Sequence, residues 1–242
     1  MKIIIKIGTA AIFDFDKKEI KKDIINSLAK DSSKLIAEGN ELIIVSSGAV
    51  GCGKNIIKNE KSIGLKQAQF AVGQVKLMEE YSHAFSKQNL NVAQFLLTSN
   101  DLNNPTSLKN IKETYRHLKG KIIPIVNEND LTSLEELSFG DNDFLASLLL
   151  LKLNFDILII LTEIGVLIKD KKPLTKSNLF LPEDYDKMNI ASAGFGGLKS
   201  KLNVAKKIIA TGKECIIAKA GNSIQDILSE KVLATRFILT KF

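Results

Sequence analysis

Short apolar segments rich in β-branched residues alternate along this chain with longer segments in which apolar residues recur every three or four positions. Each apolar segment is four to six residues long and lacks strict alternation of apolar and polar residues. This pattern predicts strands that are buried on both faces of a sheet. The predicted strands are Ile3–Ile7, Glu41–Ser46, Val92–Leu97, Ile122–Asn127, Ile157–Leu161, Glu214–Ile217 and Arg236–Leu239.

The longer segments predict helices over Lys18–Glu38, Gln67–Gln88, Thr106–Lys119, Asn142–Asn154 and Leu198–Thr211. Because strands and helices alternate, we predict an α/β fold, a three-layer α/β/α sandwich with an open, mostly parallel central sheet. The chain shows no internal repeat, low-complexity tract or linker, so residues 1–242 are predicted to form a single domain. The charged, Pro-containing segment 169–185 is predicted to be a surface loop or a small hairpin.

Composition narrows the class of protein. The 242 residues include 34 basic and 27 acidic side chains, and the net charge of +7 favours nucleic acid or phosphorylated metabolites equally. Trp is absent and aromatic residues make up 6%, so stacking platforms for single-stranded nucleic acid would be hard to build. Cys52 and Cys215 belong to no Cys/His cluster, which excludes a structural zinc site and argues against a disulfide framework.

The apolar segments are also too short or too interrupted for membrane insertion. The N-terminal apolar stretch is shorter than the core of a signal peptide. Residues 144–168 form the most apolar region, but Lys152, Asp156 and Glu163 interrupt it, so it cannot span a bilayer. We therefore expect a cytoplasmic protein that has no membrane partner.

Polar and glycine residues gather where the predicted strands end. In an open α/β sheet, ligands bind beyond the carboxyl ends of the strands, near helix N-termini with free N–H groups. The segments at such positions are Lys6-Ile7-Gly8-Thr9, Ser46-Ser47-Gly48-Ala49, Asn127-Glu128-Asn129-Asp130, Gly140-Asp141-Asn142-Asp143, Thr162-Glu163 and Gly194-Phe195-Gly196-Gly197. Loops without a ligand would not need this arrangement repeatedly, so we expect a binding site at this edge.

Single residues in these segments also have simpler explanations. The Ser47-Gly48 pair could be only a tight connection, and Asp141 could be only the N-cap of the following helix. Lys6 is different, because a lysine that ends a buried strand needs water, a carboxylate or a phosphate beside its charge. Lys201 follows glycines whose backbone N–H groups can approach an anion, although a helical lysine is usually solvated.

One segment, 48–54, nearly matches the phosphate-binding loop G-x-x-x-x-G-K-[ST] after a strand. The next residue is Asn55, which lacks the hydroxyl that would hold Mg²⁺. The strand that ends in Thr162-Glu163 also lacks the Asp that such proteins place on the metal. We therefore discount this interpretation.

Taken in chain order, the strand-end motifs together with Ala71-Val72-Gly73-Gln74 resemble those of the glutamate 5-kinases, in the amino acid kinase superfamily. The resemblance runs over nearly the whole chain. It implies transfer of the γ-phosphoryl group of ATP to the 5-carboxylate of L-glutamate, the first step towards proline. It also implies that the N-terminal half binds glutamate and the C-terminal half binds ATP.

The resemblance implies a role for individual residues. Lys6 and Lys201 would contact the phosphates, and Asp143 would hold both lysines in place as the third catalytic residue. Mg²⁺ would be bound mainly by the ATP phosphates and water. The glutamate site would comprise Ser47, Gly48, Asn127, Asp130, Asp141 and Asn142. The ATP site would comprise Lys6, Gly8, Thr162, Glu163, Phe195, Gly196, Gly197, Leu198, Lys199, Ser200 and Lys201.

The chain departs from the family pattern in two motifs that concern nucleotide positioning. Glu163 stands where the family commonly has Asp, and Val166-Leu167 stands where it has Leu-Tyr. Phe195, Leu198 and Ser200 replace Thr, Met and Thr. The sequence ends at Phe242, so we expect no C-terminal PUA domain of the kind that many members carry. A homo-oligomer, dimer or tetramer, is expected, and feedback by proline stays open.

Two other functions remain as alternatives. The first is phosphorylation of acetylglutamate, carbamate, aspartate or a nucleoside monophosphate within the same superfamily, but segments 127–130 and 140–143 favour free glutamate. The second is nucleic-acid binding, suggested by the net charge of +7. The lysines are spread along the chain and no known binding motif occurs, so we expect no nucleic-acid partner.

Overall fold

The computed structural model describes residues 1–54, 56–57, 62–120, 122–132, 142–169, 172–177 and 197–238. Three residues assigned to the site from the sequence, Asp141, Phe195 and Gly196, lie outside the described residues. Within the described part of the chain, none of the helices combines the length and apolarity needed to cross a membrane.

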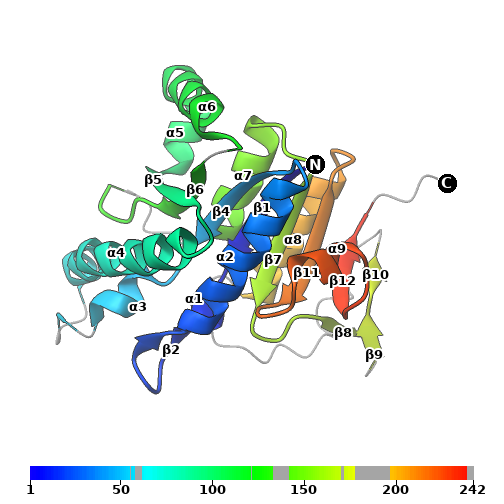
Figure 1. Cartoon of the computed structure of the whole chain (residues 1–242), viewed down its shortest axis with the longest axis horizontal. Helices are drawn as coiled ribbons and strands as arrows, with labels where there is room; N and C mark the ends of the chain where they lie inside the picture. Colours follow the sequence, from blue (N-terminus) through cyan, green and yellow to red (C-terminus); the bar gives the residue numbers. More distant parts are fainter. Residues whose placement is uncertain are drawn as a thin grey trace.

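The centre of the fold is an eight-stranded sheet with the order β10-β12-β11-β7-β1-β4-β6-β5 (Figure 1). Neighbouring strands are parallel throughout, except for the antiparallel pair β11 and β12. The predicted open, mostly parallel sheet is therefore confirmed. Its strands are β1 (Lys2–Ile7), β4 (Glu41–Ser46), β5 (Asn91–Leu97), β6 (Ile122–Glu128), β7 (Ile157–Thr162), β10 (Lys176–Ser177), β11 (Glu214–Lys219) and β12 (Ala234–Phe237).

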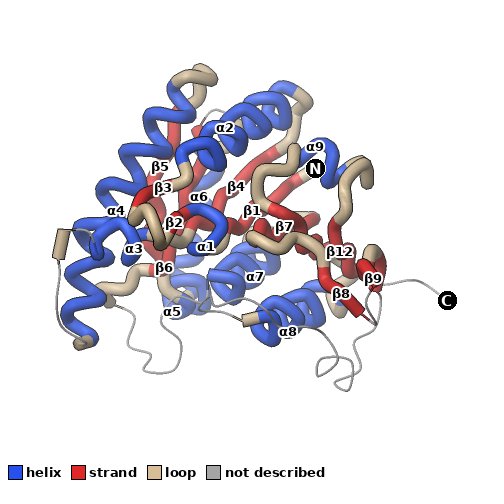
Figure 2. The backbone as a smooth tube through the Cα atoms, turned by 90° about the horizontal axis from the view of Figure 1, so that it is seen from below, coloured by secondary structure: helices blue, strands red, loops and turns tan. Residues whose placement is uncertain are grey.

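Helices cover both faces of this sheet, which confirms the three-layer sandwich (Figure 2). One layer comprises α1 (Thr9–Ile12), α2 (Lys22–Ala37), α3 (Ala49–Lys54), α4 (Ile63–Ser86) and α9 (Ile224–Leu228). The other comprises α5 (Ser99–Asn103), α6 (Pro105–Leu118), α7 (Asn142–Lys152) and α8 (Leu198–Ile209).

Side chains of the central strands alternate between the two layers, which is why their sequences are apolar without interruption. In β1, Ile3 and Ile5 pack in the core beneath α2 and α4, whereas Ile4 packs in the core beneath α7 and α8. Lys6 follows Ile4 by two positions and therefore extends towards the α7 layer. The last charged side chain of this buried strand is thus directed at the N-terminal turn of α7.

The predicted helix over Lys18–Glu38 begins later than expected, because its first residues form part of a hairpin. Strands β2 (Phe13–Asp14) and β3 (Glu19–Ile20) pair antiparallel. The Asp14 carboxylate accepts hydrogen bonds from the backbone N–H groups of Asp16 and Lys17, each 3.0 Å long, and closes the turn. A second hairpin, of β8 (Leu167–Lys169) and β9 (Lys172–Leu174), begins two residues before the segment 169–185 that was predicted to be a surface loop or a small hairpin, and residues 178–185 lie outside the described part of the chain.

Helices α3 and α4 lie backbone to backbone, because two glycines leave room between them. A Cβ atom on Gly53 would lie 1.8 Å from the carbonyl oxygen of Gln69, and one on Gly73 would lie 1.8 Å from that of Ala49. The segment that resembles a phosphate-binding loop is therefore mainly the short helix α3, pressed against α4, and not a loop. The structure thus agrees with discounting that interpretation.

Candidate active site

The carboxyl ends of four adjacent strands, β7, β1, β4 and β6, bring the sequence-predicted segments to one edge of the sheet. Backbone hydrogen bonds continue past the strands here: the N–H of Gly8 donates to Leu161 O over 3.2 Å, and the N–H of Ser47 donates to Ile7 O over 3.1 Å. Strand β1 lies between β4 and β7. The chain continues from β1 to β4 on one side, and β7, much later in the sequence, pairs with β1 on the other side. This is the kind of switch point at which α/β sheets bind ligands.

Three charged side chains from three elements meet beside β1. The ammonium group of Lys6 lies 2.6 Å from Asp143 Oδ1, and that of Lys201 lies 2.9 Å from Asp143 Oδ2. Asp143 is in the first turn of α7, and Lys201 is in the first turn of α8. The Asp143 side chain is fully buried, Lys6 is 5% exposed and Lys201 is 16% exposed. We call these residues the charge triad.

The charge triad contains one positive charge more than negative ones. Burial by itself would raise the pKa of Asp143, but the charges of Lys6 and Lys201 and their hydrogen bonds outweigh it, so the pKa is lowered. Asp143 is therefore ionised at neutral pH and carries its negative charge beside both ammonium groups. Two ammonium groups held at fixed positions beside β1 are donors of charged hydrogen bonds, so the triad is suited to a phosphate group.

Glycines keep the space next to the charge triad open. A Cβ atom on Gly8 would lie 3.8 Å from the Lys6 ammonium nitrogen, so glycine leaves the space beside this group open. Gly48, beside Ser47, has a φ of +105°, which residues with a Cβ rarely adopt. A Cβ there would also lie 2.9 Å from Ile12 Cγ2. Position 48 therefore requires glycine for reasons of backbone conformation and shape.

A network of side-chain amides joins β4, β6 and α7 at the same edge. Asn142 donates to Asn127 Oδ1 over 2.9 Å and to Ser47 Oγ over 3.0 Å, and it accepts the N–H of Glu128 over 3.1 Å. Asn127 in turn donates to Gln74 Oε1 on α4 over 2.8 Å. The structure thus brings Ser47, Asn127 and Asn142 together as the sequence predicted, and it adds Gln74.

Asp130 lies just beyond β6 and is 9% exposed. Its Oδ1 atom is buried and has no hydrogen-bond partner among the described residues. Burial raises the pKa of this carboxyl group to about 6, because the ionised form loses contact with water. A carboxylate in this state needs a cation to complete its surroundings.

The residues predicted to bind ATP are only partly described. Gly197 precedes α8, and its carbonyl oxygen accepts the N–H of Ser200 over 3.0 Å. Leu198 packs against the core beneath α7 and α8, and Lys199 is exposed. On β7, Thr162 Oγ1 accepts the N–H of Gly165 over 2.9 Å. These contacts fix the backbone at the ends of β7 and at the start of α8.

Glu163 lies at the surface and does not contact the charge triad through any described interaction. Its side chain is 61% exposed, and its nearest cation is Lys21 at 3.6 Å. Among the described residues, no three His, Cys, Asp or Glu side chains gather closely enough to hold a metal ion.

Residues 1–219 match the amino acid kinase family. The chain is also 36% identical to a glutamate 5-kinase of Dictyoglomus turgidum, over 100% of this chain and 67% of that protein. It is 35% identical to a glutamate 5-kinase of Enterococcus faecalis, over 98% of this chain and 94% of that protein. The chain belongs to the amino acid kinase family, among the glutamate 5-kinases. The resemblance drawn from the motifs is thus confirmed.

Solved structures show the amino acid kinase fold in more distant proteins. A carbamate kinase from Giardia superposes with a TM-score of 0.67 at 17% identity, covering 99% of both chains. A UMP kinase from Ureaplasma parvum also gives a TM-score of 0.67, at 15% identity over 98% of this chain and 99% of that one. At such identities the likeness concerns the fold alone.

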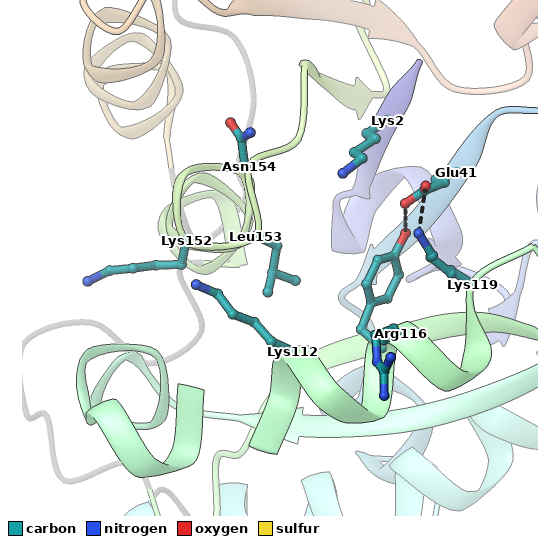
Figure 3. Close-up of a pocket in the computed structure, with 9 residues that line it drawn as sticks. Lys2, Glu41, Lys112, Arg116, Lys119, Lys152, Leu153 and Asn154 are labelled. Atoms are coloured by element: carbon teal, nitrogen blue, oxygen red, sulfur yellow. Dashed lines mark hydrogen bonds and ion pairs between the residues drawn. The ribbon is translucent and has the colours of Figure 1, made fainter. Parts of the chain in front are cut away.

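A pocket of about 230 Å³ lies at the opposite edge of the sheet in this amino acid kinase (Figure 3). It is lined by the first residues of β1 and β4, Lys2 and Glu41, and by side chains of α6 and the end of α7. Glu41 accepts a hydrogen bond from the Tyr115 hydroxyl over 3.0 Å and lies 3.4 Å from the Lys119 ammonium group. The residues that line this pocket include none of those predicted for the site.

Sequence reasoning about this kinase missed two buried polar residues behind the site. Gln74 and Tyr81 lie on α4, and the Tyr81 hydroxyl donates to Ser46 Oγ over 2.9 Å. The segment Ala71–Gln74 was part of the family resemblance, but its glutamine was given no role. A glutamine within an otherwise apolar stretch of a helix is the signal that could have identified Gln74.

Proposed function

We propose that this chain transfers the γ-phosphoryl group of ATP to the 5-carboxylate of L-glutamate, giving L-glutamyl 5-phosphate and ADP. This reaction is the first step of proline biosynthesis. The observation that carries the proposal is the buried charge triad, in which Asp143 holds two lysine ammonium groups. It lies at the same edge of the sheet as an amide network and as Asp130, whose Oδ1 atom has no hydrogen-bond partner among the described residues. The similarity to glutamate 5-kinases over the whole chain supports it.

Lys6 and Lys201 neutralise charge on the phosphoryl group as it moves. A carboxylate oxygen of glutamate forms the new bond to phosphorus, while the bond to the ADP oxygen breaks and its electron pair stays on ADP. The acceptor is already an anion, so the reaction requires no general base. Asp143 holds the two ammonium groups at fixed positions before the substrates arrive, which is the form of electrostatic stabilisation that accelerates such reactions most.

The amide network and Asp130 would bind the amino acid. The α-ammonium group of glutamate requires an acceptor when it leaves water, and the Asp130 carboxylate is a buried acceptor that lacks a partner among the described residues. Ser47, Gly48, Asn127 and Asn142 would line the rest of the glutamate site. Asp141, which precedes Asn142, stays a prediction of the same kind.

The nucleotide would bind between the ends of β7 and β1 and the start of α8. Gly8, Thr162, Glu163 and the segment 195–201 are the proposed ATP contacts. The only triad carboxylate is committed to two lysines, so Mg²⁺ bound with ATP would be held chiefly by phosphate oxygens and water. When bound there, Mg²⁺ neutralises phosphate charge.

Several finer expectations remain predictions. The division into a glutamate-binding N-terminal half and an ATP-binding C-terminal half follows the resemblance, as does a homo-oligomer. Feedback by proline is a further prediction of this kind. The cytoplasm is the expected compartment, because ATP is the proposed phosphoryl donor.

The main competing acceptors are those of other amino acid kinases. Acetylglutamate lacks the α-ammonium group and carbamate lacks the whole α-carbon end, so neither would pair with Asp130. A nucleoside monophosphate would bring a second phosphate, and Asp130 would repel it. The buried carboxylate at the end of β6 therefore favours an acceptor with a free α-ammonium group, such as glutamate or aspartate, and the similarity to glutamate 5-kinases favours glutamate of these two.

A trapping assay tests this function. The purified chain is incubated with ATP, Mg²⁺ and hydroxylamine, and with L-glutamate, N-acetylglutamate, carbamate, L-aspartate or UMP in separate reactions. We expect ADP release and a hydroxamate with glutamate, because an acyl phosphate is an activated carboxyl group. ADP release with another acceptor but not with glutamate would refute the assignment.

A further inference from the structure

Three buried polar atoms near the end of β6 lack hydrogen-bond partners among the described residues. They are Gln74 Nε2, Asn129 Oδ1 and Asp130 Oδ1. Buried polar groups in folded proteins are nearly always hydrogen-bonded, so three such atoms in one place call for an explanation. One of them is a donor and two are acceptors.

The direction of the amide network leaves Gln74 as its free donor. The N–H of Glu128 can only donate, so the atom of Asn142 that faces it is Oδ1, and Nδ2 of Asn142 must donate to Asn127. Asn127 then donates its own Nδ2 to Gln74 Oε1 over 2.8 Å. The N–H of Glu128 therefore fixes the orientation of each side-chain amide in this network. Gln74 Nε2 is the end of this network, in a side chain that is 3% exposed.

Gln74 faces the same loop as Asp130. Gln67 lies seven residues earlier on α4, hence on the same side of the helix, and its Nε2 donates to the carbonyl oxygen of Leu131 over 3.3 Å. Gln74 meets Asn127 at the start of this loop, and Gln67 meets Leu131 at its far end. Asn129 and Asp130 lie between these two contacts. On α4, the adjacent Gly73 lies against α3, where a Cβ would collide with Ala49 O.

We propose that Gln74 binds the substrate directly, by donating a hydrogen bond from Nε2 to the α-carboxylate of glutamate. The inference rests on the proposed function, and it names a contact from α4 in addition to the residues predicted from the sequence. Asp130 and Asn129 supply acceptors for the α-ammonium group. One donor and two acceptors at the end of β6 thus complement the two charged groups on the α-carbon of an amino acid.

This arrangement makes a specific statement about selectivity. An uncharged donor such as a glutamine amide favours a carboxylate over a carboxamide, because a hydrogen bond to a charged acceptor is roughly twice as strong. Isoglutamine, the α-amide of glutamate, keeps the 5-carboxylate and the ammonium group but lacks the α-carboxylate. Gln74 therefore contributes to the preference for glutamate over isoglutamine.

The variant Gln74→Glu tests this contact. The substitution keeps an acceptor for Asn127 but replaces the donor by an oxygen, which repels the α-carboxylate and accepts from a carboxamide. The ratio of kcat/KM for glutamate to kcat/KM for isoglutamine should fall by at least about tenfold, the scale for a hydrogen bond to a charged group. The KM for ATP should change by less than about twofold. Gln94→Glu, an exposed position on β5, is the matched control and should leave the ratio unchanged.

A structural role of Gln74 would lower activity with both acceptors equally. An unchanged ratio therefore overturns the proposal, as does the absence of detectable isoglutamine turnover by Gln74→Glu. If that variant does not fold, as judged by thermal unfolding, Gln74→Met is the second test. It removes the donor without adding charge and should also lower the ratio of kcat/KM for glutamate to kcat/KM for isoglutamine. A wild-type protein that fails to turn over glutamate would instead refute the proposed function itself.

Discussion

Two carboxyl groups at the carboxyl edge of the sheet, Asp143 and Asp130, are both buried but have opposite electrostatic surroundings. Asp143 contacts the ammonium groups of Lys6 and Lys201 at 2.6 and 2.9 Å, and its pKa is lowered. Asp130 has an oxygen without a partner among the described residues, and its pKa is raised to about 6. One carboxylate is neutralised by the protein itself, and the other is left for a ligand.

This difference distinguishes charges that are paired within the folded protein from a charge that is available to a ligand. The charge triad is assembled before the substrates bind, so its ion pairs stabilise the folded chain and keep the lysines in position for phosphoryl transfer. Asp130 destabilises the folded chain until a cation arrives, as is common for groups that exist for binding. The two carboxylates should therefore respond in opposite ways to neutralisation.

The largest expected effect is on stability, from Asp143→Asn. Removing the charge takes the Asp143 carboxylate away from two ammonium groups, which should lower the free energy of unfolding by roughly 3–5 kcal/mol. Since the pKa of Asp143 is below its ordinary value of 3.8, its contribution is present above that pH and is lost as the pH falls below it. Denaturant unfolding at pH 7.5 and at pH 3.5 measures both parts. Equal stability of the two proteins at pH 7.5 would contradict the role of the triad in folding.

The next effect concerns the rate. Lys6→Ala and Lys201→Ala should each lower kcat by at least about tenfold and on the order of 10²–10³, because each removes a fixed charge from the transferring phosphoryl group. Lys206→Ala, an exposed lysine of α8, is the matched control. Steady-state ADP release with saturating glutamate and ATP measures the change. Wild-type kcat in both triad variants would refute the proposed phosphate contacts.

The sequence predicted the sheet well because each central strand is buried on both faces and therefore uninterrupted in its apolar residues. Lys6 was identified because it breaks that pattern at a strand end. Asp143 follows Lys6 by more than a hundred residues, and its assignment came from the resemblance and not from periodicity. The structure adds the two ion pairs that bring these residues together.

Other features could not be predicted from local patterns. The hairpin of β2 and β3 depends on the Asp14 carboxylate closing a turn within a segment that has a helical pattern. The contact of Gln74 with Asn127 joins α4 to β6 across 53 residues of sequence, and no local pattern in either segment indicates it. Such contacts depend on tertiary packing.

A smaller effect is expected on glutamate binding. Asp130→Ala should raise the KM for glutamate by roughly 10–100-fold, the scale for losing one hydrogen bond between charged groups. The KM for ATP should change much less, because the nucleotide is proposed to bind at β7, β1 and α8. Initial rates with each substrate varied in turn give both constants. Equal losses for the two substrates would show that Asp130 acts on the fold and not on the ammonium group.

The pH dependence of kcat/KM should distinguish Asp130 from Asp143. Because the pKa of Asp130 is about 6, kcat/KM for glutamate should be about tenfold lower at pH 5 than at pH 7, as the carboxyl group becomes protonated in the free enzyme. Asp143 is ionised over this whole range. Asp130→Asn should lack this step, which a series of initial rates in one mixed buffer can show. The same step in the variant would assign the titration to another group.

Thermal unfolding of wild type and Asp130→Asn, with and without L-glutamate, tests the division of charges most directly. The pKa of Asp130 is raised from 3.8 to about 6, so its penalty is absent below pH 4 and complete above pH 6. At pH 7.5 the neutral variant should be more stable by about 1–3 kcal/mol, a rise of a few degrees in the midpoint. Saturating glutamate should raise the midpoint of the wild type and leave that of the variant nearly unchanged. A variant that is less stable than wild type without glutamate, or that gains as much from glutamate, would contradict the account.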